Sequence, residues 1–490
     1  MHHSKIVRQL RSLSSAELNE FGRYMHTEFF NRKERLRKLV EVLSVFVKGK
    51  QTGLEKAEVY QKLFPEERNE FRKLSVKAKE KHLRKRMDML IYELKIHLED
   101  YLVWKQSRKK GYVREMLLLE AYNEREADTF YFDLYDKLKL NLEKQDPKPI
   151  SNHYLRHVLV RDVIEHPGYR SWPNNGYGLK EVQEQLDIYY LANKLMNSWL
   201  LLLADSMINR RSEVLMLDEM LRFADMPPFK GNLYIDIYSS AIRDLRGKNF
   251  TREGLENLKK RILPGLLKRP RKEQIGLFNV LTNYTVLWWQ FNQDILKEIP
   301  FELNLIGLEN GYYQRRGVIS YADFHNITCA ATNAGKLEWA ENFVNEYGTA
   351  LPEKIRHHTV IYQKARIKHE GGKHREALNM LSEKPIFTNS ADKILERLLR
   401  IRCYYELEEN ELLENILEST RKQIERNPDF GPAAKDQIRN FVRITMRLCI
   451  ARQTASPIQA AKSVWDELQQ AKLCAAQDWL IRQVQKLLNN

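Results

Sequence analysis

The chain has 490 residues, which is longer than one compact hydrophobic core usually accommodates, so several domains or an array of repeats is expected. It contains only 20 glycines and 15 prolines, about 7% against the roughly 12% of an average soluble chain, and this scarcity argues against a turn-rich β fold. The net charge is +16, and residues 1–110 hold 27 lysines and arginines against 15 acidic residues. The basic surplus therefore lies mainly in the N-terminal part, and we predict an all-α fold.

The N-terminal part reads as a bundle of helices. Ser14 stands three residues before Glu17, the spacing of a capping box that starts a helix. A second helix is expected after Asn31. A long helix is predicted from about Arg68 to Trp104, because leucines recur there every three or four residues. We expect residues 1–110 to form a basic N-terminal helical bundle.

Basic residues crowd the start of the predicted long helix. Lys73, Lys77, Lys81 and Lys85 repeat every four residues, and Arg84 lies beside them. A stripe of this kind could neutralise the phosphates of nucleic acid or bind an acidic protein partner. It could equally be a solvated helix face, since no base-reading or stacking motif accompanies it.

The middle of the chain, residues 111–319, predicts helical hairpins without a clear period. The segment 166–178 is rich in proline, glycine and asparagine, which predicts a surface loop or a hinge. The most apolar run, 199–204, is far shorter than the ~20 residues that a membrane span requires. We interpret it as part of a buried helix and predict no membrane span.

Repeats become recognisable in residues 320–490. Short turn motifs precede Ala340, Ala377 and Leu413, at spacings of 37 and 36 residues, close to the 34-residue period of tetratricopeptide repeats. Gly335 and Gly372 open the first two motifs and allow a tight turn, whereas Glu408 opens the third. The fold class predicted is thus an N-terminal helical bundle followed by an α-solenoid of tetratricopeptide-like helix pairs.

Cysteines and histidines predict neither a metal site nor a cofactor. The four cysteines stand far apart, without a CxxC pair or a neighbouring set of histidines, and are expected to be buried, reduced thiols of a cytoplasmic protein. Two loose histidine groups remain, and neither supplies the three or four converging ligands of a metal centre; surface or capping roles are the expected alternative. The groups are His153 and His157 with Asp162 and His166, and His357 and His358 with His369 and His374.

Several short motifs resemble a family of uncharacterised all-helical proteins from Bacteroidetes. They are Phe29-Phe30-Asn31, Tyr60-Gln61-Lys62-Leu63-Phe64-Pro65, Gly307-Leu308-Glu309-Asn310-Gly311, Asp323-Phe324-His325-Asn326-Ile327, the stretch 398–407 (LLRIRCYYEL) and Asp478-Trp479-Leu480. The chain departs from the family at Thr27-Glu28, where Ser-Pro is usual, and at Glu408, where glycine is common. The resemblance implies a fold with tetratricopeptide-like repeats in the C-terminal half, and it implies no activity.

The sequence favours a binding protein over an enzyme, because no phosphate loop, nucleophile elbow or metalloprotease motif is present. We expect a protein or peptide partner, possibly acidic, in a groove of the repeats between Ser320 and Asn490. Candidate contacts on the first helix of each pair are Asn326, Tyr362 and Arg397. The alternative is a nucleic-acid-associated protein that acts through the basic N-terminal helices, and an enzyme that sequence motifs do not reveal is a third possibility.

Overall fold

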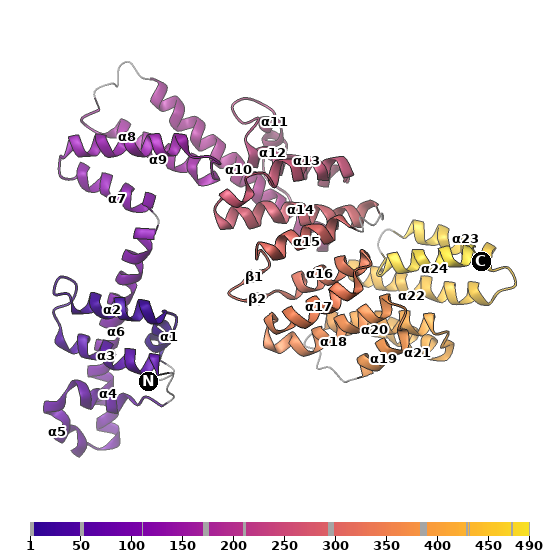
Figure 1. The fold of residues 1–490 in the computed structure, drawn as a ribbon, viewed down its shortest axis with the longest axis horizontal. Coiled ribbons are helices and arrows are strands. Elements are labelled where there is room, and N and C mark those ends of the chain that lie inside the picture. Colours follow the sequence, from indigo (N-terminus) through magenta and orange to yellow (C-terminus); the bar gives the residue numbers. More distant parts are fainter. Residues whose placement is uncertain are drawn as a thin grey trace. The chain divides into compact units, whose positions relative to one another are not determined.

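The computed structural model describes residues 4–49, 53–109, 111–169, 176–208, 212–292, 298–382, 390–427, 430, 432–471 and 474–489. Within these residues the chain is helical except for one small hairpin, so the predicted all-α class is confirmed (Figure 1). None of the described helices is both long enough and apolar enough to span a membrane.

The chain forms two compact units, Met1–Leu140 with His166–Gly168, and Asn141–Glu165 with Tyr169–Asn490. The predicted borders at residues 110 and 319 stay predictions. The predicted loop 166–178 lies partly outside the described residues, which stop at 169 and resume at 176.

The first unit contains the helices α1 (Lys5–Arg11), α2 (Ser15–His26), α3 (Glu34–Lys48), α4 (Lys56–Leu63), η1 (Pro65–Glu67), α5 (Arg68–Lys73), α6 (Val76–Lys109), α7 (Gly111–Asn123) and α8 (Asp128–Lys144). The last four residues of α8 belong to the second unit.

The second unit begins with α9 (Ile150–Glu165), α10 (Gly176–Ile208), α11 (Leu217–Ala224), α12 (Leu233–Gly247), α13 (Arg252–Ile262), η3 (Leu266–Lys268), α14 (Arg271–Asn292) and α15 (Ile299–Glu309). After the strands β1 (Gln314–Arg315) and β2 (Val318–Ile319) it continues with α16 (Tyr321–Asn333), α17 (Leu337–Tyr347), η4 (Gly348–Ala350), α18 (Glu353–Glu370), α19 (His374–Ser382), α20 (Ser390–Glu406), α21 (Asn410–Arg426), α22 (Pro432–Gln453), α23 (Pro457–Gln470) and α24 (Gln477–Asn489).

Helices α1 to α6 share one apolar core. The capping box at the start of α2 is confirmed, because the Glu17 amide donates to Ser14 Oγ at 3.2 Å and the Ser14 amide donates to the Glu17 carboxylate at 3.0 Å. These bonds with Ser14 lower the pKa of Glu17. Such a cap satisfies two amides that a helix end would otherwise leave without a partner.

The predicted single helix from Arg68 to Trp104 is wrong at its start. Helix α5 ends at Lys73, Leu74 adopts an extended conformation, and α6 begins at Val76. The Ser75 hydroxyl accepts a hydrogen bond from the Ala78 amide at 3.4 Å, so Ser75 caps a new helix rather than continuing the old one. Lys73 consequently lies on α5, and the lysine repeat on α6 is reduced to Lys77, Lys81 and Lys85.

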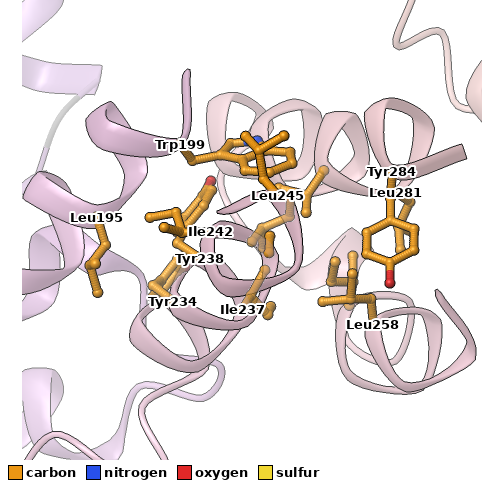
Figure 2. Packing of buried hydrophobic residues seen from close by; sticks show 14 of the residues in the cluster. Leu195, Trp199, Tyr234, Ile237, Tyr238, Ile242, Leu245, Leu258, Leu281 and Tyr284 are labelled. Atoms are coloured by element: carbon orange, nitrogen blue, oxygen red, sulfur yellow. The ribbon is translucent and has the colours of Figure 1, made fainter. Parts of the chain in front are cut away.

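The largest apolar core among the described residues is formed by the successive helices from α10 to α15 in the second unit. Figure 2 shows Trp199 of α10 packed over Tyr238, Ile242 and Leu245 of α12. The apolar run 199–204 is only partly buried, because Trp199 is 1% exposed whereas Leu200 is 52% exposed. The run is therefore amphipathic, with its buried positions one helical turn apart.

The three turns that the sequence places in equivalent positions share one backbone geometry. Gly335, Gly372 and Glu408 adopt φ values of 72°, 77° and 58°. In each turn the next amide donates to a carbonyl five residues earlier, at 2.9, 2.8 and 3.0 Å, which is the hydrogen bond of a Schellman motif. The left-handed φ explains glycine at the first two positions and makes Glu408 an exception.

A β-hairpin precedes α16 and was not predicted. Strands β1 and β2 pair antiparallel, with Gln314 opposite Ile319, and the two residues between them, Arg316 and Gly317, have φ values of 54° and 76°. Two positive φ values are typical of a tight type I′ turn. The hairpin leads directly into α16, whose first turn is capped by Ser320.

Candidate functional site

Polar side chains gather where the first helices of three consecutive helix pairs meet. They are buried or half-buried, and burial of polar groups requires hydrogen-bond partners. We call this set the polar seam. It consists of His325, Cys329 and Thr332 on α16, His358, Gln363, Arg366 and His369 on α18, and Asp392, Arg402 and Cys403 on α20.

Helices α16 and α18 are joined by side chains on matching faces. Arg366 donates to Cys329 Sγ at 2.6 Å and to Thr332 Oγ1 at 3.0 Å. The Gln363 amide donates to Nδ1 of His325 at 2.8 Å, and Nε2 of that ring lies 3.3 Å from Cys329 Sγ. Burial lowers the pKa of His325 to about 3, so the ring is neutral and accepts at Nδ1.

Helices α18 and α20 are joined in the same way. His358 Nε2 lies 3.2 Å from Asp392 Oδ2, and Cys403 Sγ lies 3.5 Å from Nδ1 of His369. All these contacts between first helices connect residues 34 to 38 positions apart, which is about one repeat. The same helix face is therefore used in each pair.

The final helix, α24, contacts the C-terminal ends of α18 and α20. Arg482 donates to Glu370 at 3.0 Å, and Glu406 accepts from Trp479 at 3.1 Å and from Gln483 at 2.6 Å. Burial by itself would raise the pKa of Glu370, but the guanidinium groups around it outweigh burial and lower that pKa. The last helix is thus fixed to the seam through two carboxylates.

Guanidinium groups in the seam outnumber their carboxylate partners. Arg366 is 7% exposed and forms no ion pair with any residue that the structure describes. Arg402 lies 3.6 Å from Glu370, but its Nε donates to no described residue. Because a buried cation without a carboxylate is unfavourable, this face can accept an additional acidic group.

The first histidine group does not converge. His153 is 8% exposed and contacts Gln185 at 2.8 Å, while His157 faces the Val182 carbonyl at 2.9 Å. His166 belongs to the other unit, where it stacks on Tyr131 with ring centroids 4.2 Å apart. The expected surface or capping role is wrong for His153 and His166, which are buried.

The second group separates into three positions. His357 lines a pocket of about 420 Å³ between α17 and α18, and His358 contacts Asp392. His369 and His374 face each other, with their Nδ1 atoms 3.0 Å apart. Together with Cys403 they place three possible metal-ligand atoms within 4.8 Å of one another, a convergence that was not expected for this group from the sequence.

The cysteines are all free thiols, but two of them differ from expectation. Cys403 and Cys474 are buried, whereas Cys329 and Cys449 are half-buried. Cys329 and Cys403 each contact a histidine, although no set of histidines neighbours either cysteine in the sequence. Burial raises the pKa of Cys403 to about 12, and burial lowers that of His369 to about 2.

The predicted partner contacts are not brought together on one exposed surface. Asn326 is exposed on α16. Tyr362 is only 7% exposed, so the expectation that it is a surface residue is wrong. Arg397 is half-buried and donates to Ser419 of α21 at 2.9 Å. A surface aromatic was expected at position 362, but this ring stacks on His325 instead.

The predicted basic residues are exposed. These five residues are Lys73, Lys77, Lys81, Arg84 and Lys85. None of them forms an ion pair with another described residue. Their neighbour Arg86 pairs with Glu67 at 3.1 Å. The cationic face at the start of α6 is therefore available to an external anion.

Comparison with protein-family models, curated proteins and solved structures returned no match. The functional proposals below rest on the geometry of the polar seam and of the basic helix.

Proposed function

We propose that the protein is a non-enzymatic scaffold of the cytoplasm, in which tetratricopeptide-like helix pairs stack as an α-solenoid and bind an acidic segment of a partner protein. The four free thiols are consistent with a reducing compartment. Three turns of one geometry, 36 and 37 residues apart, support the repeat arrangement.

The observation that carries the proposal is the set of contacts one repeat apart along α16, α18 and α20. They support one continuous face built from three pairs, which is how helical repeats present extended binding surfaces. Arg366 gives that face positive charge without a carboxylate partner among the described residues, and Arg402 pairs with Glu370 but leaves its Nε without a described acceptor. Glutamate or aspartate side chains of a partner would complete their coordination as bidentate pairs.

The test is affinity capture from native cells with the full chain as bait, followed by mass spectrometry. A variant with Asn326→Glu and Arg397→Glu changes the first helices at positions with exposed or half-buried side chains. We expect it to lose partners that the unmodified chain captures, and those partners to share acidic segments.

A matched control carries the same two chemical changes on second helices, Asn342→Glu on α17 and Arg421→Glu on α21, where both side chains are exposed. The control should keep the partners. Identical partner sets for the unmodified chain and both variants would contradict binding through the first helices.

The second candidate function is nucleic-acid association through the start of α6. It is favoured by the exposed cations Lys77, Lys81 and Lys85, which recur every four residues and so lie along one helix face. Neutralising phosphates by such a face is independent of base sequence and weakens steeply with salt.

A gel-shift titration of the full chain with DNA and RNA at low salt tests this candidate. Lys77→Glu/Lys81→Glu/Lys85→Glu should abolish a shift that the unmodified chain produces. The control with Lys260, Lys268 and Lys272 changed to Glu alters the net charge equally, since these lysines are also exposed and outside any ion pair with described residues. A shift that both variants lose equally, or no shift at all, would exclude a specific role for α6.

A further inference from the structure

Three side chains from consecutive helices converge at the end of the polar seam. His369 lies in the last turn of α18, His374 opens α19, and Cys403 lies on α20. The turn between the histidines contains Gly372 at φ 77°, and the Lys373 amide donates to the Lys368 carbonyl at 2.8 Å. This tight turn brings two histidines five residues apart face to face.

Two of the three distances between the ligand atoms are close to those of a tetrahedral zinc site. With zinc–nitrogen and zinc–sulfur bonds of about 2.0 and 2.3 Å, the two nitrogens would stand roughly 3.3 Å apart and sulfur and nitrogen about 3.6 Å apart. The corresponding separations are 3.0 Å between the Nδ1 atoms of His369 and His374, and 3.5 Å between Cys403 Sγ and Nδ1 of His369. All three ligand atoms lie within 4.8 Å of one another.

Nδ1 of His369 faces two polar atoms at once. Nδ1 of a neutral histidine carries either one hydrogen or one lone pair. It lies near both Nδ1 of His374 and the sulfur of Cys403 and can share a full hydrogen bond with only one of them. A metal ion accepts lone pairs from all three atoms at once.

Two carboxylates lie next to the ligand residues, together with three basic groups that pair with them. Glu370 follows His369 directly, and Glu406 lies one helical turn after Cys403 on α20. The basic groups that approach these carboxylates are held in ion pairs, Arg402 and Arg482 with Glu370 and Lys486 with Glu406. Carboxylates close to the ligands of a metal site commonly stabilise it.

We propose that His369, His374 and Cys403 bind one divalent cation of the zinc class, with a fourth position open to water beside the half-buried His374. Two imidazoles and a thiolate form a borderline-soft ligand set, which suits zinc better than magnesium or calcium. On binding, the Cys403 thiol loses its proton to solvent as the sulfur–metal bond forms. The ion ties α18, α19 and α20 together, and so stabilises two neighbouring helix pairs.

Metal content of the full chain tests the site directly. The protein is stripped with a chelator, dialysed against zinc and analysed by elemental mass spectrometry. We expect about one ion per chain, in keeping with a single three-ligand centre. With cobalt in place of zinc, the intense visible bands of tetrahedral coordination and a near-ultraviolet thiolate-to-cobalt band should appear.

Two variants separate binding from folding. Cys403→Ser should lose the ion and the thiolate band, and His374→Asn, at a half-buried position, should lose most of the ion while keeping the helical circular dichroism of the unmodified chain. Cys329→Ser is the matched control, because Cys329 also contacts a histidine but lacks a second one. It should retain about one ion per chain.

Three outcomes would overturn the proposal. They are an unmodified chain that holds no zinc after dialysis, retention of zinc by both Cys403→Ser and His374→Asn, and equal loss of zinc from Cys329→Ser. The proposal does not depend on the scaffold function, since metal content is measured without any partner.

Discussion

The turns between the two helices of each pair allow a test of the backbone geometry. In this test, replacing glycine with alanine should lower stability at one position and raise it at another. At Gly372 an added Cβ would meet no atom within 4 Å, so Gly372→Ala has no steric cost. Its φ of 77° is left-handed, which costs a residue with a side chain roughly 1–2 kcal/mol. The smaller conformational freedom of alanine in the unfolded chain returns about half of this.

We therefore expect Gly372→Ala to destabilise the second unit by about 1 kcal/mol. Glu408 occupies the equivalent turn at φ 58°, so Glu408→Gly should stabilise that unit by about 0.5 kcal/mol, after the entropy of glycine is subtracted. The ion pair between Glu408 and Arg452, at 3.4 Å and 71% exposed on the Glu408 side, contributes little to the difference.

Thermal unfolding followed by calorimetry should show a fall of Tm of roughly 1–2 °C for Gly372→Ala and a rise of roughly half that for Glu408→Gly. Gly276→Ala is the control, because Gly276 lies inside α14 and an added Cβ would meet only the Tyr238 hydroxyl at 3.8 Å. Alanine is favoured in a helix, so this variant should gain stability. The reasoning is refuted if Gly372→Ala is as stable as the unmodified chain while Gly276→Ala behaves as expected.

Three further changes test other parts of the fold. Trp199→Ala should destabilise the second unit by about 3–5 kcal/mol in denaturant titrations, since the ring is 1% exposed; a loss below about 1 kcal/mol would contradict the packing in Figure 2. Ser14→Ala should cost about 1 kcal/mol of the first unit, whereas Ser14→Thr, which keeps the cap, should cost far less. The lowered pKa of His325, about 3, leaves the ring neutral in the folded chain, whereas it protonates on unfolding. His325 should therefore lower stability by about 1.4 kcal/mol for each pH unit below about 6.5, in addition to the similar effect of His369. His325→Gln should flatten that slope by about one proton in parallel titrations, and an unchanged slope would refute the burial of His325.

Local signals predicted much of the fold. The Ser14 capping box and the turn at Gly372 were recognised because each depends on residues close together in the sequence. The break before Val76 was missed because a single serine cap interrupts a leucine pattern that otherwise continues. The hairpin at Arg316-Gly317 was missed because arginine is not typical of the first position of such a turn.

The polar seam was missed for a different reason. Its contacts join residues 34 to 38 positions apart, and a pattern within one helix does not reveal which side chains face the next. Spacing does hold a signal, however. Steps of 37 and 36 residues lead from Cys329 to Arg366 and on to Arg402, so the repeat period applied to polar positions would have aligned the seam.

The proposed metal ligands were not predicted for the same reason. His369 and His374 were considered among histidines only, and Cys403 among cysteines only, although the three atoms converge through a turn and a neighbouring helix. Convergence of this kind depends on packing between helices, which composition and motif spacing do not describe.

The central claim, that the first helices of the repeats form the surface that binds a partner, is tested most directly by quantitative capture with the paired charge variants. Partners should disappear with Asn326→Glu/Arg397→Glu and persist with Asn342→Glu/Arg421→Glu. Equal recovery of the same partners with both would contradict it.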